Sequence, residues 1–230
     1  QPLAPFLDSA ANLSATLTND IERTLALLFG TPANYNSSNV LTLASGTTSW
    51  AAVTSASSSP LSNIATARAR LRAILGKEPN LLVLSAGAAD ALAAHPEIQN
   101  LRRYTDPGLS NSGVPDTLRG MRTVIASATY NSASPGAPEA LARIFRTSTG
   151  GELALVAHID DAALSDRSIQ SCLMPTCDIG YGHGITVRTY RDDPAGGAYV
   201  QASICYDLLA GAVDDAGKVT SAFLIANVTA

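Results

Sequence analysis

Ser85 is the side chain whose position most resembles that of a catalytic nucleophile. It follows an apolar run, Leu81 to Leu84, and precedes an alanine-rich stretch of helical character. Many hydrolases hold a nucleophilic serine on a tight turn between a strand and a helix. That motif needs a glycine two residues to either side, whereas the residues here are Val83 and Gly87. The alternative interpretation is that Ser85 caps the following helix.

A serine nucleophile also needs a base, and the sequence has three histidines to supply one: His95, His158 and His183. A triad requires a histidine within hydrogen-bond reach of the serine and a third group that orients the ring. Nothing in the spacing of these histidines favours that arrangement. The sequence therefore does not favour a serine hydrolase that uses Ser85.

Cys172 and Cys177, together with His158 and His183, could form a zinc site of two cysteines and two histidines. Structural zinc sites usually have two residues between paired cysteines, and the sequence lacks such a pair. A local disulfide or two free thiols is the favoured interpretation.

Adjacent acidic residues and one glycine-rich run are further candidates for ion or phosphate binding. The acidic pairs are Asp160-Asp161, Asp192-Asp193 and Asp214-Asp215, and the run GYGHG covers 180–184. Neighbouring side chains on a strand point to opposite faces, so turn chemistry explains the acidic pairs better. No Lys-Ser or Lys-Thr follows the glycines, so they indicate a bend. We therefore predict no enzyme activity, no catalytic or metal-binding residues, and no cofactor.

The elements that would position these residues begin with a long helix from Asp8 to Phe29, which Gly30 and Pro32 end. Its apolar stripe has the spacing of three to four residues expected of a helix, and consists of Leu13, Leu17, Ile21, Leu25 and Leu28. After it, Val40 to Leu43 form a short β-prone core in a loop or hairpin. A second helix should start at Ser59-Pro60, with Ser59 as its N-cap, and end at Gly76.

The middle of the chain alternates between strand and helix patterns. We predict a strand at Leu81 to Leu84, then a helix from Gly87 to Tyr104 that bends at Pro96. Pro115 to Gly120 should form a short helix before the β-prone RTVIASATY. A similar alternation follows, in which SPGAPEALARIF leads to a strand at Leu153 to His158.

The last third predicts a long antiparallel hairpin, GITVRTYRDDPAGGAYVQASICYD, around a turn at Asp-Asp-Pro-Ala-Gly-Gly. Thr186, Arg188 and Tyr190 alternate with Val187 and Thr189, so one face should be polar and exposed. A final apolar strand lies in SAFLIANV. Overall, these patterns indicate a mixed α+β chain.

The composition restricts the function. The chain has 230 residues, 46% of them hydrophobic, and a net charge of −4, so it can bury a substantial core but offers no broad cationic face for nucleic acid. It has neither a membrane-span pattern nor a signal peptide, and its three cysteines favour a reducing compartment. Its first residue, Gln1, suggests that a segment precedes it.

In order along the chain, several segments resemble the major capsid proteins of tailed bacteriophages (Caudoviricetes), which have the Hong Kong 97-type fold. The resemblance lies in the helix ending LLFGTPANY, in SNIATARARLRAILGKEPNLLVLS, in DALAAHPEIQNLRRYTD and in the closing hairpin. Each segment is a diffuse pattern, and their order carries the specificity.

The resemblance implies two domains. A peripheral domain, residues 1–50 and 182–216, would contain the long helix as its spine and the hairpin as its long strands. An axial domain, residues 51–181 and 217–230, would contain a central sheet flanked by helices. The family's N-terminal arm and extended loop, which precede the spine helix, are not present in this sequence.

The resemblance also implies a function in assembly. The protein would form homopentamers and homohexamers of an icosahedral shell around double-stranded DNA, without sequence-specific binding and without a membrane. Its other partners would be portal, scaffolding or protease proteins and decoration proteins. It would assemble in the host cytoplasm and reside in the virion. An encapsulin-like nanocompartment shell is the nearest alternative. Lysine crosslinking has only Lys77 and Lys218 as candidates.

Overall fold

The computed structural model describes residues 4–104, 113–134, 136–159, 186–192, 197–203 and 213–229. The helices are α1 (Ala4–Gly30), α2 (Pro60–Leu75), α3 (Ala86–Ala94) and α4 (Pro96–Tyr104), with short 3-10 helices η1 (Pro32–Asn34) and η2 (Ser37–Asn39). The strands are β1 (Val40–Thr42), β2 (Leu81–Ser85), β3 (Thr117–Leu118), β4 (Met121–Ala126), β5 (Thr129–Asn131), β6 (Leu141–Arg143), β7 (Leu153–Ala157), β8 (Thr186–Asp192), β9 (Gly197–Ser203) and β10 (Ala222–Ala226).

A six-stranded mixed sheet in the order β1-β10-β7-β2-β4-β3 is the centre of the body. β7 runs antiparallel to both β10 and β2, while β2 and β4 are parallel. The apolar runs of β7 and β10 are buried at every position, which is expected of strands covered on both faces. The mixed α+β class predicted from the sequence is confirmed.

Alternate residues of the central strands enter two separate cores. Leu84, Val156 and Ile225 point to the face that α2, α3 and α4 cover. Leu155 and Leu224 point to the opposite face, where they pack with Phe29 at the end of α1. The sheet therefore separates the helices of the body from α1.

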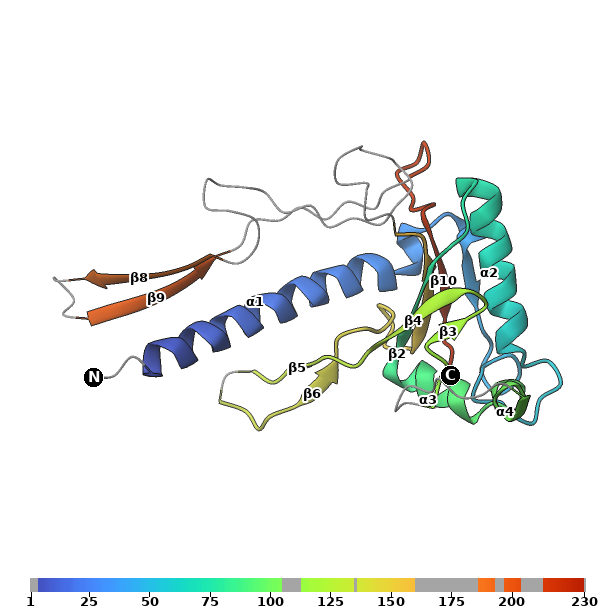
Figure 1. The fold of residues 1–230 in the computed structure, drawn as a ribbon, viewed down its shortest axis with the longest axis horizontal. Helices are drawn as coiled ribbons and strands as arrows, with labels where there is room; N and C mark the ends of the chain where they lie inside the picture. The colour runs from blue at the N-terminus through green and yellow to red at the C-terminus, as the bar shows by residue number, and fades with distance from the viewer. Residues whose placement is uncertain are drawn as a thin grey trace.

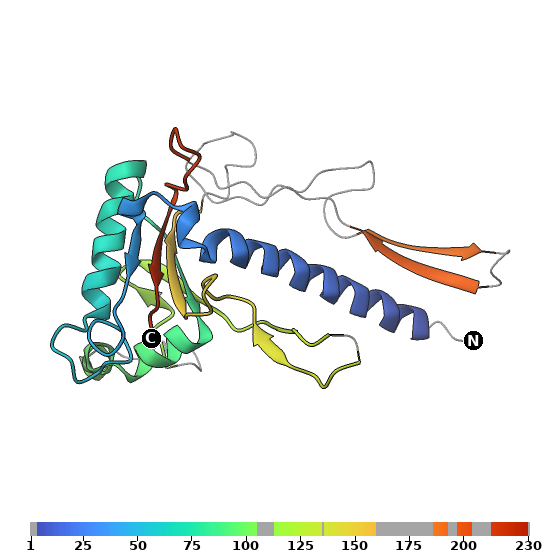
Figure 2. The ribbon, with the colours of Figure 1, turned by 180° about the vertical axis from the view of Figure 1, so that it is seen from behind.

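Three elements project from the body to the same side (Figures 1 and 2). α1 is the longest, with 27 residues or about 40 Å of helix. The β8–β9 ribbon lies beyond the sheet, and its strand β9 contacts α1. The β5–β6 hairpin is the third projection, and the guanidinium of Arg23 on α1 lies 4.8 Å from the ring centroid of Tyr130.

The two strands of the predicted hairpin pair antiparallel, with Val187 opposite Ala202 and Arg188 opposite Gln201, and residues 193–196 of its predicted turn lie outside the described residues. The predicted polar face is also observed, since Arg188 and Gln201 are exposed. On the other face, Ala202 is half-buried, and its strand β9 is the one that contacts α1. Val187, which shares the face of Ala202, is exposed, so α1 covers only part of the apolar face of the ribbon.

Several local predictions were wrong. Residues 115–120 contain strand β3 and the turn to β4 instead of a helix, because Arg119 and Gly120 both adopt positive φ, at 54° and 80°, and close a two-residue turn. SPGAPEALARIF supplies strand β6, which pairs with β5, where a helix was expected. Val40 to Thr42 pair in parallel with β10 instead of forming a local hairpin. The interruption predicted at Pro96 is confirmed in its position, and it is a break at His95 between α3 and α4 where a bend was expected.

β1 lies in the body sheet, although the resemblance assigns 1–50 to a peripheral domain. The two-domain division remains a prediction, and part of it, 160–185, lies outside the described residues.

Candidate functional site

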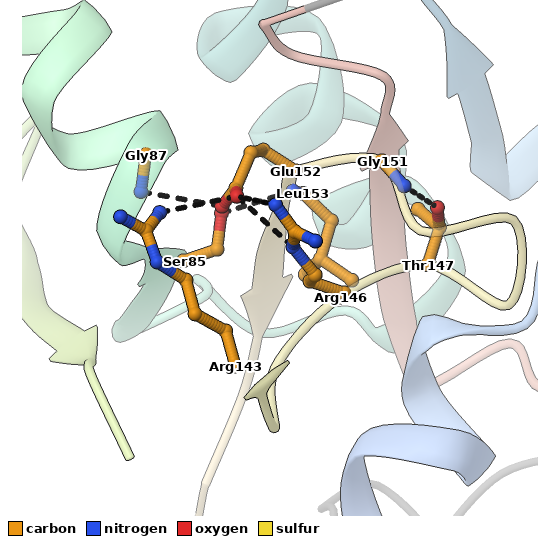
Figure 3. A network of polar contacts seen from close by, with 8 residues as sticks. All are labelled: Ser85, Gly87, Arg143, Arg146, Thr147, Gly151, Glu152 and Leu153. Atoms are coloured by element: carbon orange, nitrogen blue, oxygen red, sulfur yellow. Dashed lines mark hydrogen bonds and ion pairs between the residues drawn. The ribbon is translucent and has the colours of Figure 1, made fainter. Parts of the chain in front are cut away.

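Ser85 ends β2 at the edge of a buried polar network (Figure 3). Its side chain is fully buried, and its hydroxyl oxygen accepts a hydrogen bond of 3.0 Å from the amide of Leu153. The same hydroxyl donates to the carboxylate of Glu152. Ser85 occupies the predicted N-cap position of α3, but its side chain makes no capping hydrogen bond to that helix.

Glu152 supplies the cap in its place. Its Oε2 accepts the amide of Gly87, in the first turn of α3, at 3.2 Å. Its Oε1 accepts from Arg143 Nη1 at 3.1 Å and from Arg146 Nη2 at 2.9 Å. Glu152 is only 6% exposed, so four groups surround one buried carboxylate at the positive end of a helix.

The electrostatics favour an ionised Glu152. Burial acts to raise the pKa of this carboxyl group, but the hydrogen bonds from Ser85 and Arg146 and the charge of Arg143 outweigh burial. The pKa of Glu152 is therefore lower than its ordinary value. The network contains two cations and one anion, and the cations are partly exposed, at 39% for the Arg143 side chain and 43% for that of Arg146.

Glycines bring the backbone close enough to build this network. A Cβ on Gly87 would lie 2.7 Å from Cδ of Glu152, and a Cβ on Gly30 would collide with the carbonyl oxygen of Arg146. The amide of Ser148 donates to the carbonyl of Gly30 at 3.2 Å. The segment 143–152 therefore joins the end of α1, the β5–β6 hairpin and the start of α3.

This arrangement does not provide nucleophilic chemistry at Ser85. Its hydroxyl contacts a carboxylate and a backbone amide, and it is closed to solvent. His95 hydrogen-bonds to Ser58, and His158 Nδ1 lies 2.8 Å from the carbonyl oxygen of Glu78. His183 lies outside the described residues. The described part of the chain therefore places no histidine beside Ser85.

Three of the four predicted zinc ligands, Cys172, Cys177 and His183, lie outside the described residues. Within the described ranges, no group of three or more His, Cys, Asp or Glu residues is arranged to hold a metal ion.

The acidic pairs are also described only in part. Asp214 is described, and its Oδ1 accepts the amides of Ala216 and Lys218, as turn chemistry predicts. Asp160, Asp161 and Asp193 lie outside the described residues, as does the glycine run at 180–184.

A second polar cluster lies where α3 meets α4. The carboxylate of Glu97 accepts from the Ser59 hydroxyl at 2.7 Å and from the Leu61 amide at 3.1 Å, so it caps α2. Ser59 itself makes no capping bond. Both predicted serine caps are thus replaced by carboxylates from elsewhere in the chain, which the sequence analysis did not identify.

The projecting elements carry several exposed apolar side chains. Leu141 on β6 is 68% exposed, and Leu27 on α1 is 57% exposed. Val187 and Tyr199 on the ribbon are each 42% exposed. These positions are candidates for contacts with other protein chains. Among the described residues, no helix is long and apolar enough to cross a membrane.

Comparison with known proteins identifies the fold only. No protein-family model matches the chain, and no curated protein matches it in sequence. Among solved structures, eleven chains match, including a phage-related protein from Bordetella bronchiseptica RB50 with a TM-score of 0.63 and 19% identity. The match covers 90% of this chain and 61% of that chain. The protein therefore shares a mixed α+β fold with a phage-related protein, and spans about three fifths of its length.

Proposed function

We propose that the protein is a major capsid protein of a tailed bacteriophage, with the Hong Kong 97-type fold. It assembles through homopentamers and homohexamers into an icosahedral shell around double-stranded DNA. In this proposal α1 is the spine helix and the β8–β9 ribbon provides the long strands. It functions in the virion after assembly in the host cytoplasm, has no enzyme activity, and meets portal, scaffolding or protease and decoration proteins.

The observation that carries this proposal is the fold match over 90% of the chain to a phage-related protein. The shape of the molecule supports it as well. α1, the ribbon and the hairpin extend from one side of the body and carry exposed apolar side chains, including Leu27 and Leu141. Repeated contacts of modest strength between such elements become a stable particle when the shell closes.

Electron microscopy and sedimentation of the full-length protein test the proposal. Rings or shells are expected, and a protein that stays monomeric at every concentration would contradict it. Leu141→Asp should reduce the assembled fraction, because it places a charge in a contact. Leu141→Met is the matched control, since it keeps an apolar side chain of similar volume. Both variants should unfold within about 0.5 kcal/mol of the wild type, because Leu141 is exposed in the single chain.

The content of purified particles separates the two kinds of shell. Genomic DNA inside them supports the capsid, whereas a co-purifying cargo protein supports an encapsulin-like nanocompartment. Labelling with a fluorophosphonate tests the hydrolase alternative. We expect no label on Ser85, because its hydroxyl is fully buried, and stoichiometric labelling of Ser85 would favour a hydrolase.

A further inference from the structure

His95 is a buried histidine at the corner between α3 and α4. It ends α3, precedes Pro96 and is 3% exposed. Its ring lies between the segment 44–59 and the start of α4, and it contacts both through hydrogen bonds. A titratable ring in such a place can connect the proton concentration to the packing of two segments.

The hydrogen bonds determine which nitrogen carries the proton. The hydroxyl of Ser58 donates to the carbonyl of Ser49 at 2.7 Å, so its oxygen is an acceptor for His95 Nε2–H at 3.3 Å. The amide of Glu97 donates to Nδ1, also at 3.3 Å. The neutral ring therefore uses its one donor and its one acceptor. A second proton, on Nδ1, would point at the Glu97 amide N–H, so two donors would face each other and this hydrogen bond would be lost.

The charges around the ring are few. The segment 44–59 contains no charged residue, Asp90 on α3 is exposed, and Arg68 on α2 pairs with Glu78. Arg102 and Arg103 lie two turns further along α4. Glu97 is therefore the charged group that bears on the ring. Burial lowers the pKa of His95, and the carboxylate of Glu97 opposes that effect only in part.

Glu97 has a second role that protonation would disturb. While His95 is neutral, the Glu97 carboxylate caps α2 through Ser59 and Leu61. A protonated Nδ1–H needs an acceptor, and this carboxylate is the nearest anion in sequence. One acidic group would then serve either the helix or the imidazolium. Such competition between two arrangements is what a conformational switch requires.

We propose that His95, Ser58 and Glu97 form an acid-sensitive latch that holds the segment 44–59 against the α3–α4 corner. A solvent proton added to Nδ1 removes the acceptor for the Glu97 amide and draws the Glu97 carboxylate away from Ser59 and Leu61. The segment 44–59 then loses its tie to Glu97 and is released, while the six-stranded sheet stays folded. This inference does not depend on the proposed capsid function, because it concerns contacts within one chain.

Trp50 offers a direct reporter of the latch. It is the only tryptophan of the chain, it is fully buried, and it follows Ser49, the acceptor for the Ser58 hydroxyl. Its amide donates to the carbonyl of Val228 at 2.8 Å. Release of the segment should expose the indole and shift its emission to longer wavelength.

The test is a titration of the full-length protein between about pH 8 and about pH 5, followed by tryptophan emission and far-UV circular dichroism. The wild type should show a red shift with a midpoint below about 6.5, the ordinary pKa of histidine, with unchanged circular dichroism. His95→Gln should remove the transition, and His158→Gln, the matched control, should keep it. Absence of the transition in the wild type, or its persistence in His95→Gln, would overturn the proposal.

Glu97→Gln keeps the proposal testable if His95→Gln does not fold. The carboxylate favours the protonated ring, so its removal should move the midpoint to lower pH. A midpoint that is unchanged or raised in this variant contradicts the mechanism. Hydrogen exchange of amides 44–61 should accelerate at the same pH as the emission shift, while exchange in β7 and β10 stays slow.

Discussion

Replacement of Glu152 tests the view that one buried carboxylate holds the joint between the body and its projections. Glu152→Ala removes the acceptor for the Gly87 amide, the Ser85 hydroxyl and two guanidinium groups. Glu152→Gln keeps the shape and one oxygen acceptor but removes the charge. The two variants separate the loss of packing and hydrogen bonds from the loss of the ion pairs.

The expected magnitude follows from burial. Removing one partner of a buried ion pair costs about 3–5 kcal/mol. Arg143 and Arg146 have side chains 39% and 43% exposed, so water can solvate them once the carboxylate is gone. We therefore expect the low end, about 3 kcal/mol for Glu152→Ala, and about half of that for Glu152→Gln. For a chain of this size, about 3 kcal/mol corresponds to a fall in Tm of roughly 6–12 °C.

Urea denaturation and thermal melting at neutral pH measure these changes. The control is Glu139→Ala, because Glu139 is exposed between β5 and β6 and should change the unfolding free energy by less than about 0.5 kcal/mol. Hydrogen exchange should also increase in β6, which carries Arg143. If Glu152→Ala unfolds within about 1 kcal/mol of the wild type, the carboxylate is not the organising group of this joint.

Four further changes have defined directions. The pKa of Glu152 is lower in the fold than its ordinary value of 4.5, so its contribution is fully present above pH 4.5 and is lost as the pH falls through the folded pKa. In acid titrations, the unfolding free energies of the wild type and Glu152→Gln should therefore still differ at pH 4.5 and converge only at lower pH. Gly87→Ala should lower the free energy of unfolding in urea by about 1–3 kcal/mol, because the methyl group would lie 2.7 Å from Glu152 Cδ and displace it. This displacement outweighs the better helix propensity of alanine. A gain in stability would contradict this prediction. Arg119→Asn should raise the free energy of unfolding in urea by about 0.5–1 kcal/mol, since asparagine tolerates the positive φ of 54° better than arginine. Gly120→Ala should lower the Tm, because alanine is strained at the positive φ of Gly120.

The sequence by itself determined the elements whose signals are local. The apolar stripe of the first helix and the glycine at its end predicted α1, and Ser59-Pro60 with Gly76 located α2. The apolar runs predicted β7 and β10, because strands buried on both faces need apolar residues at every position. The alternation in the closing hairpin predicted its polar face. These features depend on neighbours within a few residues, so the pattern is visible in the sequence.

Only the tertiary structure decided which groups complete those elements. The acceptors that cap α2 and α3 are Glu97 and Glu152, which lie 38 positions from Ser59 and 65 positions from Gly87. A carboxylate is a stronger acceptor than a serine hydroxyl at the positive end of a helix, so it replaces the local cap when the fold brings it near. Ser85, the first candidate nucleophile, is consequently a buried link between β2 and β7. Such long-range partners leave no pattern in the sequence around the residues they serve.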